Sequence, residues 1–409
     1  MHRIPHGRHA DSSPDYGPVV FLMHGLMSSS EAFIGLGPDY SLAYNLADAG
    51  FDVWMGNARG NQYSRSHISL NPDHDIQKFA FFDFTFEEIG LYDLPAMIDY
   101  ALEASGKQML HYIGHSQGGT AFLVFGALRN DYLLKVASAH LLAAVGYQEF
   151  FPNAALAASA DNVDQIYTLA LMGGIVELYP GFLEGLTPAA GYSMADYCTG
   201  NLKLRYMCEL FGVKHVLRQD ETTPPGGASL KQAAHYGQNI RDKLFRRYHF
   251  GTEKNKVVYG SEEPPLYDIS LIDVDVTMHY TVSDNLLDER DVQAMAADMP
   301  NTIVRKVTRE SFKHEDFVAA MDAKELVTDY IIEALRNTPD TIEEDISTGV
   351  DEVIVVDNNT TPADTTPADT TPADTTPAGD TTLTTPGGSA TITLLNVYLI
   401  LFSLVLLIK

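Results

Sequence analysis

The five residues GHSQG at 114–118 constrain the fold of this chain more than any other feature of the sequence. They follow an apolar run at 109–113, which is typical of a buried strand, and precede a helix-like stretch at 121–129. In the pattern G-x-S-x-G, a sharp strand-to-helix turn exposes the serine, and the small flanking residues let strand and helix approach closely. The isolated pattern is common by chance, so the strand before it and the helix after it carry the argument. Together they predict that Ser116 is a nucleophile.

The rest of the body alternates short apolar runs with helical stretches. The runs end at glycines or polar loops and lie at 19–23, 51–55, 109–113, 141–145, 274–280 and 302–307. A helix is predicted at 93–106, because Asp93 can cap it, Pro95 is tolerated in its first turn and apolar residues repeat at helical spacing. This alternation predicts a mostly parallel sheet with helices on both faces, and together with the serine turn at 114–118 it indicates the α/β-hydrolase fold.

The alternation stops between residues 147 and 270, where irregular helical stretches are interrupted by proline-rich loops. Ligands bind at the carboxyl edge of the strands in open α/β sheets, so we expect an inserted, mainly helical cap over that edge. The predicted organisation is a sheet domain in two parts, 1–146 and 271–337, with the cap at 147–270 between them.

The composition indicates a globular, acidic protein. Hydrophobic residues make up 45% of the chain and aromatic residues 10%, which is enough to build a sizeable core. The formal net charge is -27, so the chain lacks the excess of basic residues with which proteins bind the phosphates of nucleic acids. An anionic membrane would repel a protein of this charge. We therefore expect contact with lipid through apolar surface, no nucleic-acid partner, no obligate protein partner, and no cofactor or metal.

A nucleophilic serine needs a histidine to take its proton, and in this fold that histidine comes last in the chain order serine, acid, histidine. His314 lies beyond the last predicted strand, just before an apolar helix, and is our candidate base. His279 sits inside a predicted strand, and His235 and His249 fall in the predicted cap, so they are weaker candidates.

The acid that orients the histidine should lie in the loop after the preceding strand. Asp284 follows the predicted strand at 274–280 directly and is our candidate. Asp288 and Asp291 are alternatives, but they fall where a helix begins, and favourable interaction with the helix N-terminus explains them.

The tetrahedral intermediate of ester cleavage needs backbone N–H donors aimed at its oxyanion. Gln117, the residue after the nucleophile, is expected to supply one donor. The second is expected from the loop after the strand at 19–23, from Leu26. His24 in the same loop precedes the serine, which is the wrong order for a catalytic base, so we interpret it as structural.

The C-terminal part of the sequence differs in composition from the body. A repeat of Thr, Pro, Ala and Asp begins at Thr360 inside the acidic stretch 338–391, which predicts an extended, disordered stalk. The mostly apolar segment 392–408 follows small residues and fits either a GPI attachment signal or a short membrane span. Asn358 and Asn359 begin Asn-x-Ser/Thr sequons and are candidates for glycosylation.

The two cysteines bear on the cellular compartment. Cys198 and Cys208 fit one local disulfide as well as two free thiols, and the C-terminal segment, interpreted as a secretory-pathway signal, favours the disulfide. No signal peptide is visible at the N-terminus, since residues 1–6 lack an apolar run. We expect an extracellular or cell-surface location with a C-terminal membrane anchor, the alternatives being a lysosomal or a secreted protein.

Several blocks of the sequence resemble the acid lipase family, which includes the gastric and lysosomal acid lipases and insect relatives. The resemblance runs from Arg3 to about Asp322. The matching blocks occur in the family's order at 3–5, 19–22, 24–26, 48–54, 56–60, 92–96 and 114–118.

By position, this resemblance implies a nucleophile at Ser116, an acid at Asp284 and a base at His314, with oxyanion donors at Leu26 and Gln117. It also implies a cap over the site, a cap disulfide that the two cysteines resemble, and activity on triacylglycerols and sterol esters.

Three features depart from the family pattern. The chain begins inside the family's domain, so the secretion signal and the first strand or two are expected to be missing. Asn285 and Gly119 stand where relatives often have other residues, and neither removes a catalytic group. The stalk and the apolar tail lie outside the family core.

The sequence thus predicts a serine ester hydrolase, and more specifically a lipase. A sterol esterase or a short-chain carboxylesterase is the alternative within enzymes. A catalytically silent lipid-binding protein on a lipase scaffold is the alternative from another class, and the presence of serine, acid and histidine argues against it.

Overall fold

The centre of the molecule is a seven-stranded sheet in the computed structural model, which describes residues 1–8, 16–178 and 227–339. The strand order is β1-β3-β2-β4-β5-β8-β9, and β1 alone in this sheet runs antiparallel to its neighbour. The strands are β1 (His2–Ile4), β2 (Val19–Met23), β3 (Asp52–Met55), β4 (Leu110–His115), β5 (Val136–Leu142), β8 (Asp275–Tyr280) and β9 (Thr302–Lys306). The predicted fold class, a mostly parallel sheet with helices around it, is confirmed.

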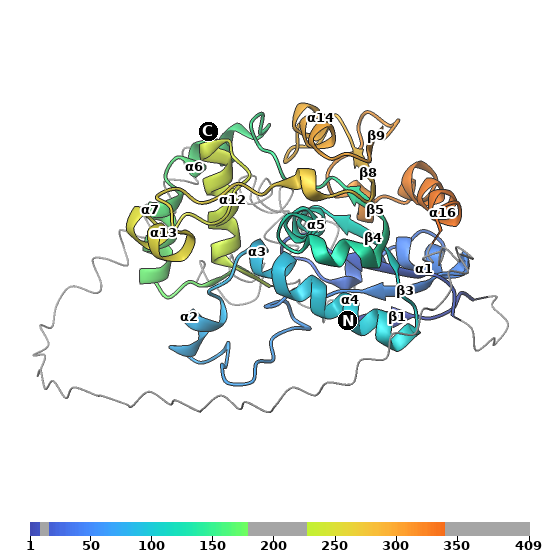
Figure 1. The fold of residues 1–409 in the computed structure, drawn as a ribbon, viewed down its shortest axis with the longest axis horizontal. Helices are drawn as coiled ribbons and strands as arrows, with labels where there is room; N and C mark the ends of the chain where they lie inside the picture. Colours follow the sequence, from blue (N-terminus) through green and yellow to red (C-terminus); the bar gives the residue numbers. More distant parts are fainter. Residues whose placement is uncertain (9–15, 179–226, 340–409) are drawn as a thin grey trace, which may run out of the picture.

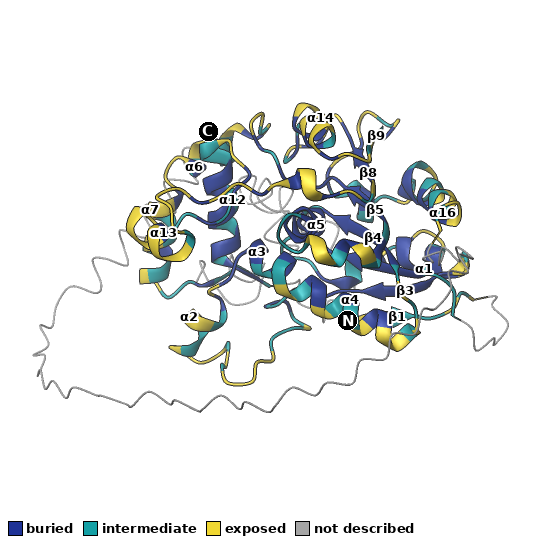
Figure 2. Ribbon diagram, viewed as in Figure 1, coloured by how far each residue is buried: buried dark blue, intermediate teal, exposed yellow. Residues whose placement is uncertain are grey.

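Helices pack against both faces of this sheet (Figure 1). Strand β2 is buried at all of its positions, as its unbroken apolar sequence predicts for a strand covered on both sides. Figure 2 shows buried residues along the strands and exposed residues on the outer sides of the helices. The helices around the sheet are α1 (Leu42–Asp48), α3 (Phe86–Glu88), α4 (Leu94–Ser105), α5 (Gln117–Leu128), α14 (Glu289–Asp298), α15 (Asp316–Ala319) and α16 (Asp329–Arg336).

Short helical turns connect these elements. The 3-10 turns are η1 (Ser30–Phe33), η3 (Asn130–Lys135) and η4 (Ile269–Leu271). Two π-helical turns, η2 (Ile89–Asp93) and η5 (Lys324–Thr328), lead into α4 and α16. Helix α4 ends at Gly106, whose φ of 69° is a left-handed cap that glycine adopts without strain.

A second group of helices lies beside the sheet, at the left of Figure 1. It consists of α6 (Ala154–Ala160), α7 (Val163–Met172), α12 (Leu230–Asp242) and α13 (Thr252–Tyr259), with the two short paired strands β6 (Glu177–Leu178) and β7 (Ala228–Ser229) and, nearby, α2 (Gln77–Phe81). Helix α12 packs on α6 and α7. The ring of His235 on α12 stacks on Phe86 of α3 with centroids 4.0 Å apart, which ties this group to the sheet domain.

Two strands differ from the sequence-based prediction. Strand β5 begins at Val136 and ends at Leu142, whereas we predicted 141–145. Ser138 and His140 interrupt its apolar pattern, but both side chains are buried and bonded within the sheet, Ser138 to His111 and His140 to His279. The strand stops where Ala143 takes a φ of 51°.

Strand β1 precedes the first strand that we predicted. Its three residues are too few to show a hydrophobic period, and its place depends on a side-chain contact. Arg3 donates two hydrogen bonds of 2.8 Å to the carboxylate of Asp52, which is fully buried, and its guanidinium lies 4.6 Å from the ring centroid of Trp54. These contacts hold the edge strand against β3.

Several predicted features lie outside the described residues: Cys198, Cys208, Asn358, Asn359, the segment 392–408 and nearly all of the stalk. Within the ranges that the structure does describe, no helix is both long and apolar enough to cross a membrane.

Candidate active site

Ser116 occupies the sharp turn between β4 and α5 that the sequence predicts. Its φ of 51° and ψ of -116° lie in a region that residues with a side chain seldom adopt. The backbone N–H of Ser116 donates to the carbonyl of Leu142 at 2.9 Å, and the N–H groups of Gly119 and Thr120 donate to the carbonyl of Ser116 at 2.9 and 3.1 Å. The turn therefore presents the side chain of Ser116 beyond the carboxyl end of β4.

The glycines around Ser116 are required by close packing. A Cβ at Gly118 would lie 2.1 Å from the carbonyl oxygen of Met23, and a Cβ at Gly114 would lie 2.6 Å from the carbonyl carbon of Gly118. At Gly119, which departs from the family pattern, a Cβ would lie 2.3 Å from that of Ala144. These positions let α5 cross the sheet closely enough to form the turn.

Three side chains from three loops meet at this turn. The Oγ of Ser116 lies 2.8 Å from Nε2 of His314, and Nδ1 of His314 lies 2.8 Å from Oδ2 of Asp284. The side chains of His314 and Asp284 are 2% and 1% exposed. The structure therefore brings the three predicted residues into one hydrogen-bonded series, which we call the triad.

Asp284 is held in place by the backbone that follows it. Its Oδ1 accepts hydrogen bonds from the N–H groups of Leu286 at 2.8 Å and Leu287 at 3.1 Å, which leaves Oδ2 for His314. A buried carboxylate bonded in this way fixes the ring orientation of His314 and favours the tautomer with a proton on Nδ1.

The charge environment favours the protonated form of His314. Burial alone would lower the pKa of this imidazole, but the charge of Asp284 and its hydrogen bond raise the pKa above the ordinary value, with a smaller contribution from Glu315. An imidazolium formed during a reaction is therefore stabilised where it stands.

The side chain of His115 contacts the backbone of His314. Its Nε2 donates a 3.0 Å hydrogen bond to the carbonyl of His314, and the two rings lie 5.4 Å apart. Burial, and then the charge of His314, lower the pKa of His115 to about 3, so His115 stays neutral. It connects the strand that ends at the nucleophile to the backbone of the base.

The two predicted oxyanion donors flank Ser116. Gln117 is the first residue of α5, where a backbone N–H has no partner within the helix, and Leu26 belongs to the loop after β2. That loop passes close to the serine, because a Cβ built on Gly25 would lie 3.2 Å from Cβ of Ser116.

His24 has the structural role that we predicted. Its Nδ1 donates to the carbonyl of Gly25 at 2.7 Å, and its Nε2 accepts from the N–H of Ala58 at 3.1 Å. Burial lowers its pKa to about 4, so the ring is neutral and can accept. The histidine thereby fixes the loop that carries Leu26.

The alternative acids make their contacts elsewhere. Asp288 caps α14 by accepting from the N–H of Arg290, and Asp291 accepts from the N–H groups of Glu149 and Phe150. Both are explained by these bonds.

The alternative histidines also make their contacts elsewhere. His279 is buried in β8 against His140, His235 bonds the carbonyl of Arg246, and His249 accepts from the N–H of Gly251.

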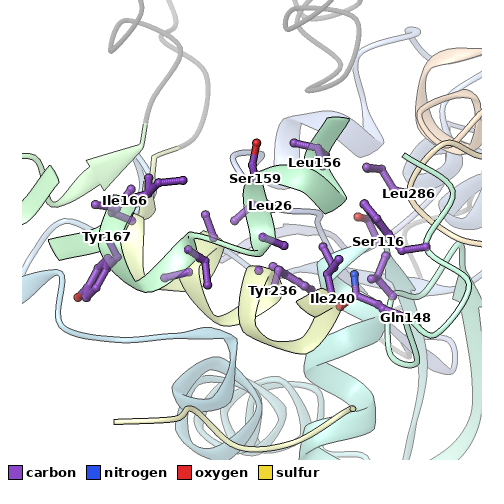
Figure 3. Close-up of a pocket in the computed structure, with 18 of the residues that line it drawn as sticks. Leu26, Ser116, Gln148, Leu156, Ser159, Ile166, Tyr167, Tyr236, Ile240 and Leu286 are labelled. Carbon is purple, nitrogen blue, oxygen red and sulfur yellow. The ribbon is translucent and has the colours of Figure 1, made fainter. Parts of the chain in front are cut away.

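A pocket of about 280 Å³ begins at Ser116 and extends between the helices of the second group (Figure 3). Ser116, Gln148 and Leu286 lie at one end in this view, and Ile166 and Tyr167 lie at the other. Most of the lining is apolar, including Leu26, Val145, Phe151, Leu156, Val163 and Ala233. Among the described residues, no three His, Cys, Asp or Glu side chains are grouped to hold a metal ion.

Comparison with known proteins identifies the family. Residues 18–182 match the model of the alpha/beta hydrolase fold. Lipase 3 of Drosophila melanogaster is 36% identical over 345 residues, which cover 82% of this chain and 86% of that protein. Gastric triacylglycerol lipase of Homo sapiens is 31% identical over 339 residues, covering 81% of this chain and 83% of that protein. The chain belongs to the acid lipase family.

For two residues beside the triad of this acid lipase, no role was predicted from the sequence. His115 occupies a variable position of the G-x-S-x-G pattern. Glu315 follows His314 in the chain and lines the pocket. Their positions depend on contacts between distant segments, and a single sequence holds no direct signal for such contacts.

Proposed function

We propose that this chain is a serine ester hydrolase that cleaves carboxylic esters of apolar lipids such as triacylglycerols. The observation that carries the proposal is the 2.8 Å contact between Ser116 Oγ and His314 Nε2 at one end of an apolar pocket. When His314 is in its unprotonated form, this contact makes the serine an activated nucleophile.

In the proposed reaction, Ser116 Oγ attacks the ester carbonyl carbon while His314 Nε2 takes the hydroxyl proton. The carbonyl oxygen becomes an oxyanion, which the N–H groups of Leu26 and Gln117 stabilise. His314 then gives the proton to the alcohol oxygen, the ester bond breaks, and the acyl group remains on Ser116. Water attacks the acyl-enzyme with His314 again as base, which releases the acid and restores the serine.

Asp284 has an electrostatic role in this proposal. It holds His314 in the reactive tautomer and stabilises the imidazolium that forms at each proton transfer. Its own orientation rests on the N–H groups of Leu286 and Leu287.

The lipid character of the substrate follows from the pocket and from the relatives. Apolar side chains of α6, α7 and α12 line the pocket, so an acyl chain can be buried there with gain from the hydrophobic effect. Relatives that share most of this chain are named as lipases, among them a gastric triacylglycerol lipase. We propose that residues 147–270 form the cap over the site.

We also propose action outside the cytosol, at a cell surface, in a lysosome or after secretion. The gastric lipases among the relatives support this proposal, and the sequence of residues 392–408 supports a membrane anchor of GPI or spanning type.

The proposal is tested by Ser116→Ala, assayed on emulsified trioctanoylglycerol and on soluble p-nitrophenyl butyrate. Because the triad acts as a unit, we expect turnover of both to fall about 10,000-fold or more. Ser105→Ala is the matched control, since this hydroxyl on α4 donates to the carbonyl of Leu102 and lies outside the pocket lining. Turnover that survives Ser116→Ala would contradict the proposal.

The same assay separates the alternatives. Activity on the soluble ester without activity on the emulsion would indicate a short-chain carboxylesterase, and a preference for cholesteryl octanoate would indicate a sterol esterase. A folded wild-type protein that binds lipid and hydrolyses none of these esters would be the silent lipid-binding protein.

A further inference from the structure

One acidic side chain lines the pocket that begins at the nucleophile. Among the described residues that line this pocket, Glu315 is the only one with a carboxyl group, and the rest of the lining is mostly apolar. It follows His314 directly in the chain, and His314 touches Ser116. Glu315 therefore stands at the serine end of the pocket.

The carboxyl group of Glu315 has no protein partner in the described ranges, where it accepts no hydrogen bond and forms no ion pair with any residue. Its neighbour Asp316, by contrast, pairs with Arg309 and accepts from the N–H of Lys313. The titratable groups that act on Glu315 are His314, Asp284 and Asp316.

Glu315 is half-buried in the wall of the pocket. Burial raises the pKa of this carboxyl, His314 opposes the rise, and the charges of Asp284 and Asp316 add to it. When a bound substrate covers this carboxyl, leaving it without a hydrogen bond costs free energy, which a ligand that supplies a donor would offset.

The chemistry of the proposed reaction decides which part of the substrate meets Glu315. His314 gives its proton to the leaving alcohol oxygen, so the alcohol part must lie beside the imidazole. Glu315 is the next residue and lines the same space. The acyl chain instead has the apolar arm of the pocket that extends toward Ile166 and Tyr167 (Figure 3).

We propose that Glu315 accepts a hydrogen bond from a free hydroxyl group on the alcohol part of the ester. The preferred substrates are then partial acylglycerols, which keep one or two glycerol hydroxyls, over triacylglycerols and simple alkyl esters. A polar group that the bound substrate buries disfavours analogues that lack the matching donor, because that group is then left unpaired. This inference rests on the proposed ester hydrolase function and specifies its substrate class.

The first test uses the wild-type protein and two esters of the same acyl chain. 1-Octanoylglycerol offers two hydroxyl donors, and 2,3-dimethoxypropyl octanoate has a similar shape without them. We expect kcat/KM to be about tenfold to a hundredfold higher for the hydroxylated ester, the range for a hydrogen bond to a charged acceptor. Equal values for the two esters would overturn the proposal.

The second test changes the acceptor. Glu315→Leu removes it at similar volume, and we expect the ratio of the two kcat/KM values to fall about tenfold. Glu315→Gln keeps an acceptor oxygen, so it should retain most of the ratio. A ratio unchanged in Glu315→Leu, with wild-type thermal unfolding, would refute the role of Glu315.

The experiments distinguish a failure of the proposed function from a failure of the role of Glu315. If the wild-type protein hydrolyses neither octanoate ester, or if Ser116→Ala hydrolyses both as the wild type does, the proposed function itself is wrong. If both esters are hydrolysed through Ser116 at the same rate, only the inference about Glu315 is wrong.

Discussion

At Ser116 the backbone is held in a conformation that costs about 1–3 kcal/mol for a residue with a side chain. Close packing maintains it, because Gly118 lies against the carbonyl of Met23, where a single methyl group would not fit. A relaxed turn would withdraw the hydroxyl from His314. The strain is therefore located where the proposed chemistry needs an exposed side chain.

The variant Asp284→Asn tests the orienting carboxylate. The amide side chain retains a similar shape but favours the wrong tautomer of His314, so kcat should fall about 10,000-fold. Since the carboxylate raises the pKa of His314, its loss lowers that pKa, and the acid limb of kcat/KM should move to lower pH.

Asp288→Asn is the control for this experiment, because Asp288 is a nearby carboxylate that caps a helix instead. A pH profile and a turnover that change equally in both variants would show that Asp284 has no special role. Kinetic profiles over pH with a soluble ester supply both readouts.

The contact between Ser116, Asp284 and His314 could be predicted from the sequence, because chain order and position after strands can be read from it directly. Their catalytic roles stay predictions. His115 and Glu315 could not be predicted, since one acts through the backbone of a residue far away in the chain and the other through the pocket it lines.

Among the elements, helix α12 forms a wall of the pocket and also ties the second group of helices to the sheet domain. Ser229, its cap, bonds the carbonyl of Phe84, and Tyr236 donates to Oγ1 of Thr120 at 2.9 Å, in the first turns after the nucleophile. The pocket therefore keeps its shape relative to Ser116.

Acyl-chain length should be controlled from this helix. Ala233 lines the pocket on α12, one helical turn before Tyr236 in the chain. In Ala233→Phe the added ring takes up space for the acyl chain, so kcat/KM for p-nitrophenyl palmitate should fall about tenfold relative to p-nitrophenyl butyrate. Ala158→Phe, at an exposed position of α6 outside the pocket lining, is the control. If kcat/KM fell equally for the palmitate and the butyrate ester, Ala233 would not lie in the acyl site.

Helices and strands with a strong period were predicted well, and α4 (Leu94–Ser105) lies within the predicted 93–106. The predicted range of β5 was wrong because Ser138 and His140 form their hydrogen bonds inside the sheet. A hydrophobic pattern cannot reveal such bonds. The predicted interruption at 147–270 does contain separate helices, but their packing depends on contacts such as His235 on Phe86.

The whole molecule contains several buried histidines that folding keeps neutral. Burial is the first cause in each case; it lowers the pKa of His24 and His235 to about 4 and that of His115 and His140 to about 3. In the unfolded chain such side chains bind a proton below about pH 6.5.

The unfolded state therefore binds more protons than the folded state between about pH 6 and pH 4. Each of these histidines should reduce the free energy of unfolding by up to about 1.4 kcal/mol per pH unit as the pH falls through that window. His314 has a raised pKa and opposes this trend, because its contribution is present at low pH and lost as the pH rises through the folded pKa. Urea unfolding at several pH values measures the balance, and the account predicts lower stability at pH 5 than at pH 7. Stability that increases on acidification would contradict it.

The fold class and the family could be predicted from ordered blocks of sequence, and both are confirmed. His24 was expected to be structural, but the neutral state of the buried histidines could not be predicted, because it follows from their three-dimensional packing. The division into sheet domain and cap stays a proposal.

The central claim is that Ser116 carries the acyl group. The most direct measurement treats the protein with a fluorescent organophosphonate, follows residual ester hydrolysis, and locates the adduct by peptide mass spectrometry. The account predicts one adduct per chain, on Ser116, with hydrolysis lost in proportion to labelling. An adduct on a different residue, or hydrolysis that persists when Ser116 is fully labelled, would contradict it.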